Sequence, residues 1–294
     1  MTEPRRYERY VAIGDSSTEG LDDPDPLGGY HGWANRLAQR IADAQGSVLY
    51  ANLGIRGKLT REIRDQQLAP AVAMRPDLAT VFSGSNDILR LRFDSRAVEA
   101  DVAHMQRTLV QGGATVVTFT LPDLTPIMPV ARVLTGRVLA MNDALRRASA
   151  STGAILVDFA VHAVGSDPRL WSEDRFHANS AGHARIAAAL AHAIGLPGSD
   201  DAWMRPLPKD ARRGALTWWA GEIGWLARHV PGWVGNLASR DRTPEVRAPK
   251  RPHLERLERA AGWKRDLGSV EQHEAPGGPK LSTDQASIVN ARRS

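Results

Sequence analysis

Short apolar runs alternate along the chain with longer stretches in which apolar residues lie three and four positions apart. The runs are rich in β-branched and aliphatic residues and predict strands at 10–14, 48–52, 78–84, 114–120 and 154–159. The longer stretches predict helices at 32–46, 96–113, 137–153 and 179–195. Strands that alternate with helices indicate a parallel sheet covered on both faces. We therefore predict a three-layer α/β/α domain with a doubly wound, five-stranded parallel sheet at 1–200.

Polar and glycine residues follow three of these strands directly. Ser16 comes after the first strand, in Gly-Asp-Ser; Gly57 lies in a glycine loop after the second; and Asn86 follows the third, in Gly-Ser-Asn-Asp. Asp174 and His177 precede the final helix. In sheets of this type, ligand sites form in the loops at the carboxyl ends of the strands. We therefore expect these residues to share one edge of the sheet.

This set of residues has the chemistry that acyl transfer needs. A serine hydroxyl becomes a nucleophile when a histidine removes its proton, and a carboxylate keeps that histidine in the right tautomer. The oxyanion formed on attack needs fixed donors, which a glycine N–H, an asparagine carboxamide and the N–H of the serine itself can supply. Taken singly, each piece is also typical of an ordinary turn, loop or helix cap.

The motifs and their order resemble the GDSL, or SGNH, family of serine esterases and lipases over residues 8–195. The resemblance implies a flavodoxin-like fold in which Ser16 is the nucleophile, His177 the base and Asp174 the residue that orients it. It also implies an oxyanion hole that includes Gly57 and Asn86, with Gly54 as the rival to Gly57. Ser17 stands where the family usually has Leu or Ile.

Other classes of enzyme fit the sequence poorly. The Gly-x-Ser-x-Gly elbow of α/β-hydrolases and the glycine fingerprint of dinucleotide-binding enzymes are both absent. The remaining histidines lack carboxylate partners at metal-ligand spacing, and the acidic stretch at 22–26 resembles a rigid turn. The chain has no cysteine, which excludes disulfides, thiolate metal sites and a cysteine nucleophile. We predict no cofactor and no metal.

The expected substrate is a small-molecule ester or thioester. The resemblance places the acyl pocket among the loops 21–33, 88–93 and 121–130, which are mostly apolar with interspersed arginines. Hydrolysis through an acyl-enzyme is the favoured activity. Acyl transfer to an alcohol at the same site is the first alternative, and a catalytically idle module that tethers to membranes is the second.

The composition changes near residue 200. Acidic and basic residues nearly balance before that point, whereas bases exceed acids beyond it, where six of the eight tryptophans also lie. We predict a basic, Trp-rich extension of helical or irregular structure at 201–266 and a disordered tail at 267–294.

Within the extension, residues 214–237 carry a helical apolar stripe. The stripe fits packing on the catalytic domain, self-association or a peripheral membrane contact. Interleaved acids argue against nucleic acid as a partner. No apolar run precedes the first strand, so we expect a cytoplasmic protein, at the membrane surface if the stripe binds lipid.

Overall fold

The structure is a computed structural model that describes residues 5–26, 28–208 and 247–260. All of them belong to one compact unit, Met1–Trp263. The five predicted parallel strands are present, and a sixth strand joins them in the order β5-β4-β3-β1-β2-β6. The strands are β1 (Arg9–Gly14), β2 (Ser47–Asn52), β3 (Leu78–Phe82), β4 (Thr115–Phe119), β5 (Ile155–Val157) and β6 (Arg251–Glu258).

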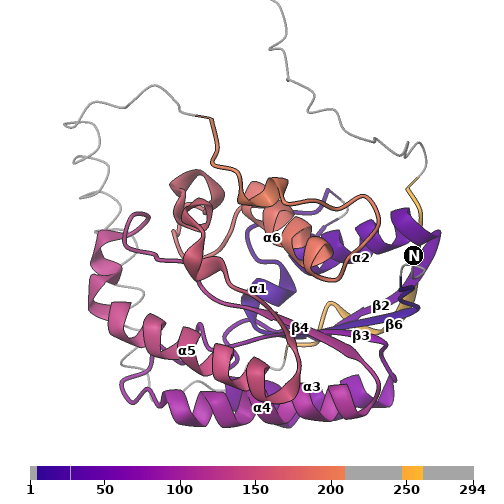
Figure 1. Cartoon of the computed structure of the whole chain (residues 1–294), viewed down its shortest axis with the longest axis horizontal. Coiled ribbons are helices and arrows are strands. Elements are labelled where there is room, and N and C mark those ends of the chain that lie inside the picture. Colours follow the sequence, from indigo (N-terminus) through magenta and orange to yellow (C-terminus); the bar gives the residue numbers. More distant parts are fainter. Residues whose placement is uncertain (1–4, 27, 209–246, 261–294) are drawn as a thin grey trace, which may run out of the picture. The chain divides into compact units, whose positions relative to one another are not determined.

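Helices cover both faces of the sheet and make it the middle of three layers (Figure 1). They are α1 (Ser16–Glu19), α2 (Gly32–Gln45), α3 (Thr60–Ala73), α4 (Ser95–Gln111), α5 (Thr135–Thr152) and α6 (Ser180–Ala193). Helices α1, α2 and α6 lie on one face, and α3, α4 and α5 lie on the other. This arrangement confirms the predicted α/β/α fold.

Strand β6 is the main departure from the predicted five-stranded sheet. It comes from the C-terminal extension, runs antiparallel to β2 and occupies the edge of the sheet. Its sequence, RPHLERLE, is mostly polar, with two leucines three positions apart, and it includes Pro252. Charged residues and proline are tolerated on edge strands because one side of such a strand makes no ladder bonds. Two segments beyond residue 200 therefore pack on the domain, because Trp203 also lies in the main core.

A cluster of aromatic rings within the core is centred on Phe119 of β4. Phe119 stacks on Phe82 with ring centroids 4.2 Å apart and meets Trp33 and Phe159 edge to face. Trp33 is fully buried. Phe159 in turn meets Trp203 edge to face at 5.4 Å. Such pairs add about 0.5–1.5 kcal/mol each beyond the area they bury, so this cluster firmly joins α2, β4 and the segment after β5.

Helix α3 was not predicted, and it contributes a side chain that holds the end of β1. Gln67 is buried, and its amide makes two hydrogen bonds with the backbone of Gly14. Gly14 N–H donates to Oε1 at 2.8 Å, and Nε2 donates to the Gly14 carbonyl at 2.9 Å. Gly14 is the last residue of β1, two positions before Ser16. The helix thus stabilises the strand end from which the candidate nucleophile projects.

Two predictions concern residues outside those described, namely the apolar stripe at 214–237 and the disordered tail at 267–294. The division of the chain at residues 200 and 266 stays a prediction. Within the described residues, every helix is too short or too polar to cross a lipid bilayer.

Candidate active site

Ser16 lies where β1 ends and α1 begins. Asp15 is the N-cap of α1, and its carboxylate accepts the N–H of Ser17 at 3.0 Å. Because Ser16 is the first residue of the helix, its own N–H has no partner within the helix. The two adjacent serines have different neighbours: Ser16 Oγ lies 2.8 Å from His177 Nε2, whereas Ser17 Oγ accepts the indole N–H of Trp33 at 3.1 Å.

His177 is held by Asp174 from the same turn. Its Nδ1 lies 2.6 Å from Asp174 Oδ2, and its backbone N–H donates to Asp174 Oδ1 at 2.9 Å. The hydroxyl of Ser172 also donates to Asp174 Oδ1, at 2.5 Å. Arg175 closes the turn with a left-handed backbone, φ +59°. The structure thus brings Ser16, His177 and Asp174 into one hydrogen-bonded chain of the kind predicted.

The charges of this chain favour a basic imidazole. Burial alone would lower the pKa of His177, but its hydrogen bond and charge interaction with Asp174, together with Asp22 and Asp15, raise the pKa above 6.5. Burial would likewise raise the pKa of Asp174, but the contact with His177 holds the pKa of that carboxyl well below 3.8. Asp174 therefore remains ionised at neutral pH, where it stabilises the imidazolium.

The glycine loop after β2 distinguishes the two rival oxyanion donors. Gly54 N–H already donates to the side chain of Asn52 at 2.9 Å, and a Cβ on Gly54 would lie 2.7 Å from Glu19 N. Gly57 has a left-handed φ of +78°, and within the described residues its N–H has no protein acceptor. Gly57 is therefore the better candidate, as the sequence predicts.

The carboxamide of Asn86 belongs to a buried polar network that sequence reasoning missed. Asn86 Nδ2 donates to the carbonyl of Lys58 at 3.0 Å and lies 3.5 Å from Asp15 Oδ2. The hydroxyl of Ser85 donates to the same carboxyl oxygen. Burial raises the pKa of Asp15 to about 6, despite the hydrogen bonds from Ser85 and Ser17. The network fixes the loops after β1 and β3 to one another.

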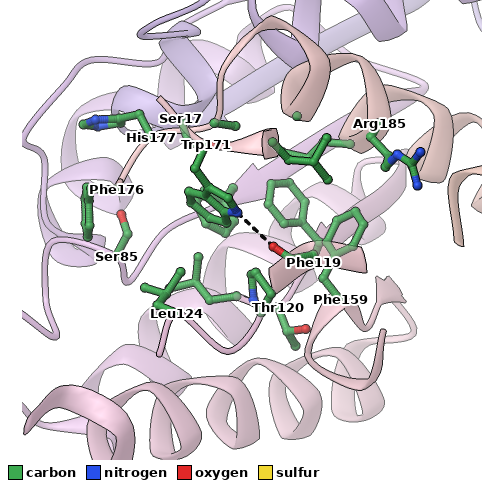
Figure 2. A pocket seen from close by; sticks show the side chains of 18 of the residues that line it. Ser17, Ser85, Phe119, Thr120, Leu124, Phe159, Trp171, Phe176, His177 and Arg185 are labelled. Carbon is green, nitrogen blue, oxygen red and sulfur yellow. Dashed lines mark hydrogen bonds between the residues drawn. The ribbon is translucent and has the colours of Figure 1, made fainter. Parts of the chain in front are cut away.

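An apolar pocket opens beside Ser16 and His177 (Figure 2). Figure 2 shows Phe119, Phe159 and Trp171 around it, with Phe176 and His177 on one side. The Trp171 indole donates to the carbonyl of Gly165 at 2.9 Å, which fixes the ring in the wall. Other apolar side chains in the lining are Phe82, Leu121, Pro122, Leu124, Val164, Leu170 and Ile186.

Only one of the three loops predicted to form this pocket does so. Leu121, Pro122 and Leu124 line it, as expected for 121–130. The prediction is wrong for 21–33 and 88–93, because Trp33 is buried in the core and none of the described residues of either loop lines the pocket. The segment 159–171 takes their place. It consists of short 3-10 turns, so its sequence shows no helical or strand period.

One group of side chains among the described residues has the spacing to hold a metal ion. Asp22, Asp174 and His177 place one ligand atom each within 4.8 Å of one another. His177 Nδ1 is already bonded to Asp174, so a metal there would displace the proton that this bond requires. Elsewhere, His183 accepts the backbone N–H of Trp33 and bonds the carbonyl of Leu21, and burial lowers its pKa to about 4. That contact is structural.

Comparison with known proteins identifies one family and several similar folds. The model of the GDSL-like lipase/acylhydrolase family matches residues 12–185. A structure described as a GDSL-like lipase from Parabacteroides merdae is 19% identical, with a TM-score of 0.57 and coverage of 66% of this chain and 98% of its own. An acetylxylan esterase from Geobacillus stearothermophilus is 18% identical, with a TM-score of 0.56 and coverage of 69% and 99%.

A third solved structure, TesA, is 21% identical, with a TM-score of 0.54 and coverage of 64% of this chain and 98% of its own. The search of curated proteins found no match. At these identities, the structural neighbours establish the fold.

Proposed function

The chain belongs to the GDSL-like lipase/acylhydrolase family, and we propose from this that it hydrolyses carboxylic esters or thioesters through an acyl-enzyme on Ser16. The observation that carries the proposal is the hydrogen-bonded chain from Ser16 Oγ to His177 and on to Asp174, with distances of 2.8 and 2.6 Å. These are ordinary hydrogen-bond lengths for a base poised on a nucleophile.

In the first step, Ser16 Oγ attacks the ester carbonyl while its proton passes to His177 Nε2. In the imidazolium that forms, Nδ1–H stays on the ring and donates a hydrogen bond to Asp174, whose negative charge stabilises the cation. When the tetrahedral intermediate collapses, His177 gives the proton to the leaving alcohol or thiol. Water then repeats the sequence on the acyl-enzyme and releases the acid and the free serine.

The oxyanion is held by donors that surround Ser16. We assign them to the N–H of Ser16, the N–H of Gly57 and the carboxamide of Asn86. Asn86 Nδ2 carries two hydrogens, of which one is held by the carbonyl of Lys58 at 3.0 Å. The other is left for substrate or for the weak 3.5 Å contact with Asp15. Because the backbone and the Asp15 network fix these donors before substrate binds, little reorganisation accompanies the reaction.

The pocket beside Ser16 supports an apolar acyl group as the part of the substrate that is recognised. Its lining is mostly apolar and includes Phe82, Phe119 and Phe159, whereas recognition of a sugar would require more polar side chains. Each buried methylene of an acyl chain contributes about 0.8 kcal/mol, so each additional carbon favours binding roughly fourfold until the pocket is full. We expect the rate to rise with chain length and then to level off or fall.

The test is the release of p-nitrophenol from a series of nitrophenyl esters of increasing chain length. Wild type is compared with Ser16→Ala and with Ser151→Ala, a control on an exposed serine near the end of α5. We expect Ser16→Ala to lose roughly a thousandfold or more in kcat/KM, and Ser151→Ala to match wild type. Wild-type turnover that survives in Ser16→Ala would refute the proposal. Product analysis with added glycerol then separates hydrolysis from acyl transfer.

A further inference from the structure

A second carboxylate faces the imidazole of His177 on the same edge as Asp174. Asp22 Oδ2 lies 3.8 Å from His177 Nδ1, and its side chain is 35% exposed. This distance is about 1 Å beyond an ordinary N–H···O hydrogen bond. The proposed acid–base chain assigns no task to Asp22, and the sequence suggests only a rigid turn there. Its position beside the reacting imidazole therefore needs its own explanation.

The backbone at Asp22 adopts a left-handed conformation, φ +66°. Only three non-glycine residues among those described have positive φ; another is Arg175, in the turn that carries His177. Aspartate and asparagine tolerate this conformation better than other side chains do. It occurs here on the two segments that bring Asp22 and Asp174 to the imidazole, as is common where the backbone is shaped by a functional site.

Neighbouring residues fix the position of Asp22 from both sides. On one side, the Leu21 carbonyl is bonded by His183 Nε2 at 2.9 Å. On the other, the carboxylate of Asp23 accepts two hydrogen bonds from Arg36, at 2.7 and 2.9 Å. Asp23 is buried, and these bonds hold its pKa well below 3.8 against the effect of burial. Asp22 therefore lies on a segment anchored at each neighbouring residue.

The far end of the same loop is anchored by the C-terminal segment. Lys250, directly before β6, donates from its ammonium to the carbonyls of Tyr30 and His31 at 3.0 and 2.9 Å. Gly20 and Gly32 meet at the base of the loop so closely that a Cβ on Gly20 would lie 2.6 Å from Gly32 Cα. The loop is thus held where Gly20 meets Gly32, at the residues on either side of Asp22, and at the carbonyls that Lys250 binds.

We propose that Asp22 is a second positioning residue for His177, which acts beside Asp174 by stabilising the imidazolium and by holding Nδ1 when Asp174 is absent. This inference rests on the proposed function of His177 as the base. Nδ1 has one proton, and Asp174, at 2.6 Å, is its acceptor. Asp22 contributes its charge from 3.8 Å and needs only a small movement to accept that proton itself.

Other charged groups also face His177, and the test must leave them unchanged. Asp15 interacts with it from the turn before α1, and His183 interacts with it from α6. Asp22→Asn alters neither group and keeps a side chain that tolerates a left-handed backbone. Asp25→Asn is the matched control, because it removes the same charge from the same loop, where Asp25 pairs with His31.

The experiment is a double-mutant cycle of Asp22→Asn and Asp174→Asn, with kcat/KM measured against pH. We expect Asp22→Asn alone to lower kcat/KM roughly threefold to tenfold, because the charge that it removes is partly screened by solvent. The acidic limb of the pH profile of kcat/KM should also move to lower pH. In the Asp174→Asn background, the same change should cost a larger factor, because Asp22 then holds Nδ1. The inference would be overturned if Asp22→Asn lowered kcat/KM by the same factor with Asp174 present and with Asp174→Asn. It would also be overturned if Asp25→Asn moved the acidic limb as far as Asp22→Asn does.

A second readout does not depend on turnover. The protonation of His177 is followed by NMR of its imidazole nitrogens in wild type and in each of the variants. We expect the pKa of His177 to fall in Asp22→Asn and to stay near the wild-type value in Asp25→Asn. If no ester is hydrolysed but this pattern appears, the proposed function has failed while the Asp22 contact stands. If esters are hydrolysed but the pKa of His177 is the same in all single loop variants, the Asp22 inference alone has failed.

Discussion

Replacement of Gln67 by alanine removes the side chain that joins α3 to the end of β1. Gln67 is 3% exposed and makes two hydrogen bonds with the backbone of Gly14, at 2.8 and 2.9 Å. The Gly14 carbonyl keeps a longer bond from Ile55 N–H at 3.2 Å, so the cost falls mainly on the Gly14 N–H. A net hydrogen bond contributes about 1 kcal/mol, and a buried group left unpaired costs about 1–3 kcal/mol.

These terms predict that the free energy of unfolding falls by roughly 2–4 kcal/mol in Gln67→Ala. For a domain of this size, the Tm should then fall by roughly 5–15 °C. Gln66→Ala is the matched control, because it makes the same change in the same helix at an exposed position. Urea denaturation followed by circular dichroism gives both values. A difference between the two variants below about 0.5 kcal/mol would refute the reasoning.

Gln67→Glu adds a pH signature that a loss of packing does not produce. When the introduced carboxyl is protonated, it can still donate to the Gly14 carbonyl and accept from the Gly14 N–H, whereas the ionised carboxylate can only accept. Burial therefore raises the pKa of this carboxyl in the folded protein above that in the unfolded chain. The stability of Gln67→Glu should be greatest below the unfolded pKa and should be lost as pH rises through the folded pKa. Wild type should lack this specific loss.

Two further predictions concern the site, and a third concerns the C-terminal anchor of the loop that carries Asp22. His177 must be neutral to act as a base, and its pKa is raised above 6.5, so kcat/KM should increase as pH rises through that pKa. Asp174→Asn should move this acidic limb of the pH profile to lower pH. A shift to higher pH would contradict the geometry. Asn86→Ala should lower kcat roughly a hundredfold, with a much smaller change in KM, by steady-state kinetics; unchanged turnover would exclude it as an oxyanion donor. Lys250→Met leaves two loop carbonyls without their donor and should lower the Tm by about 2–6 °C by scanning calorimetry, whereas an unchanged Tm would mean that the C-terminal anchor contributes nothing.

The parallel sheet could be predicted because its strands are buried on both faces and form unbroken apolar runs. Strand β6 could not be predicted, because its sequence, RPHLERLE, contains no apolar run and has charged residues at half of its positions, which an edge strand tolerates. Helix α3 was missed for a related reason. Its first turns are mostly polar, and Pro70 lies within it, so it lacks the apolar spacing that marks α2 or α4.

The candidate site was predicted where short motifs adjoin strand ends and missed where contacts span the fold. Ser16, Asp174 and His177 meet as expected because the carboxyl ends of parallel strands share one edge. The Asp15–Ser85 bond joins residues 70 positions apart, and Asp22 reaches His177 from a loop that reads as a turn. Aspartates in such a loop carry no sequence signal of what they face, so only the folded chain reveals them.

The most direct test of the central claim is to identify the residue that becomes covalently modified. A fluorophosphonate transfers its phosphonyl group to an activated serine and releases fluoride, and peptide fragmentation by mass spectrometry locates the adduct. We predict one adduct, on Ser16, that is formed rapidly in wild type and lost in Ser16→Ala. An adduct that forms on Ser17 or another serine in place of Ser16, or ester hydrolysis that continues in protein fully modified on Ser16, would contradict the assignment of Ser16 as the nucleophile.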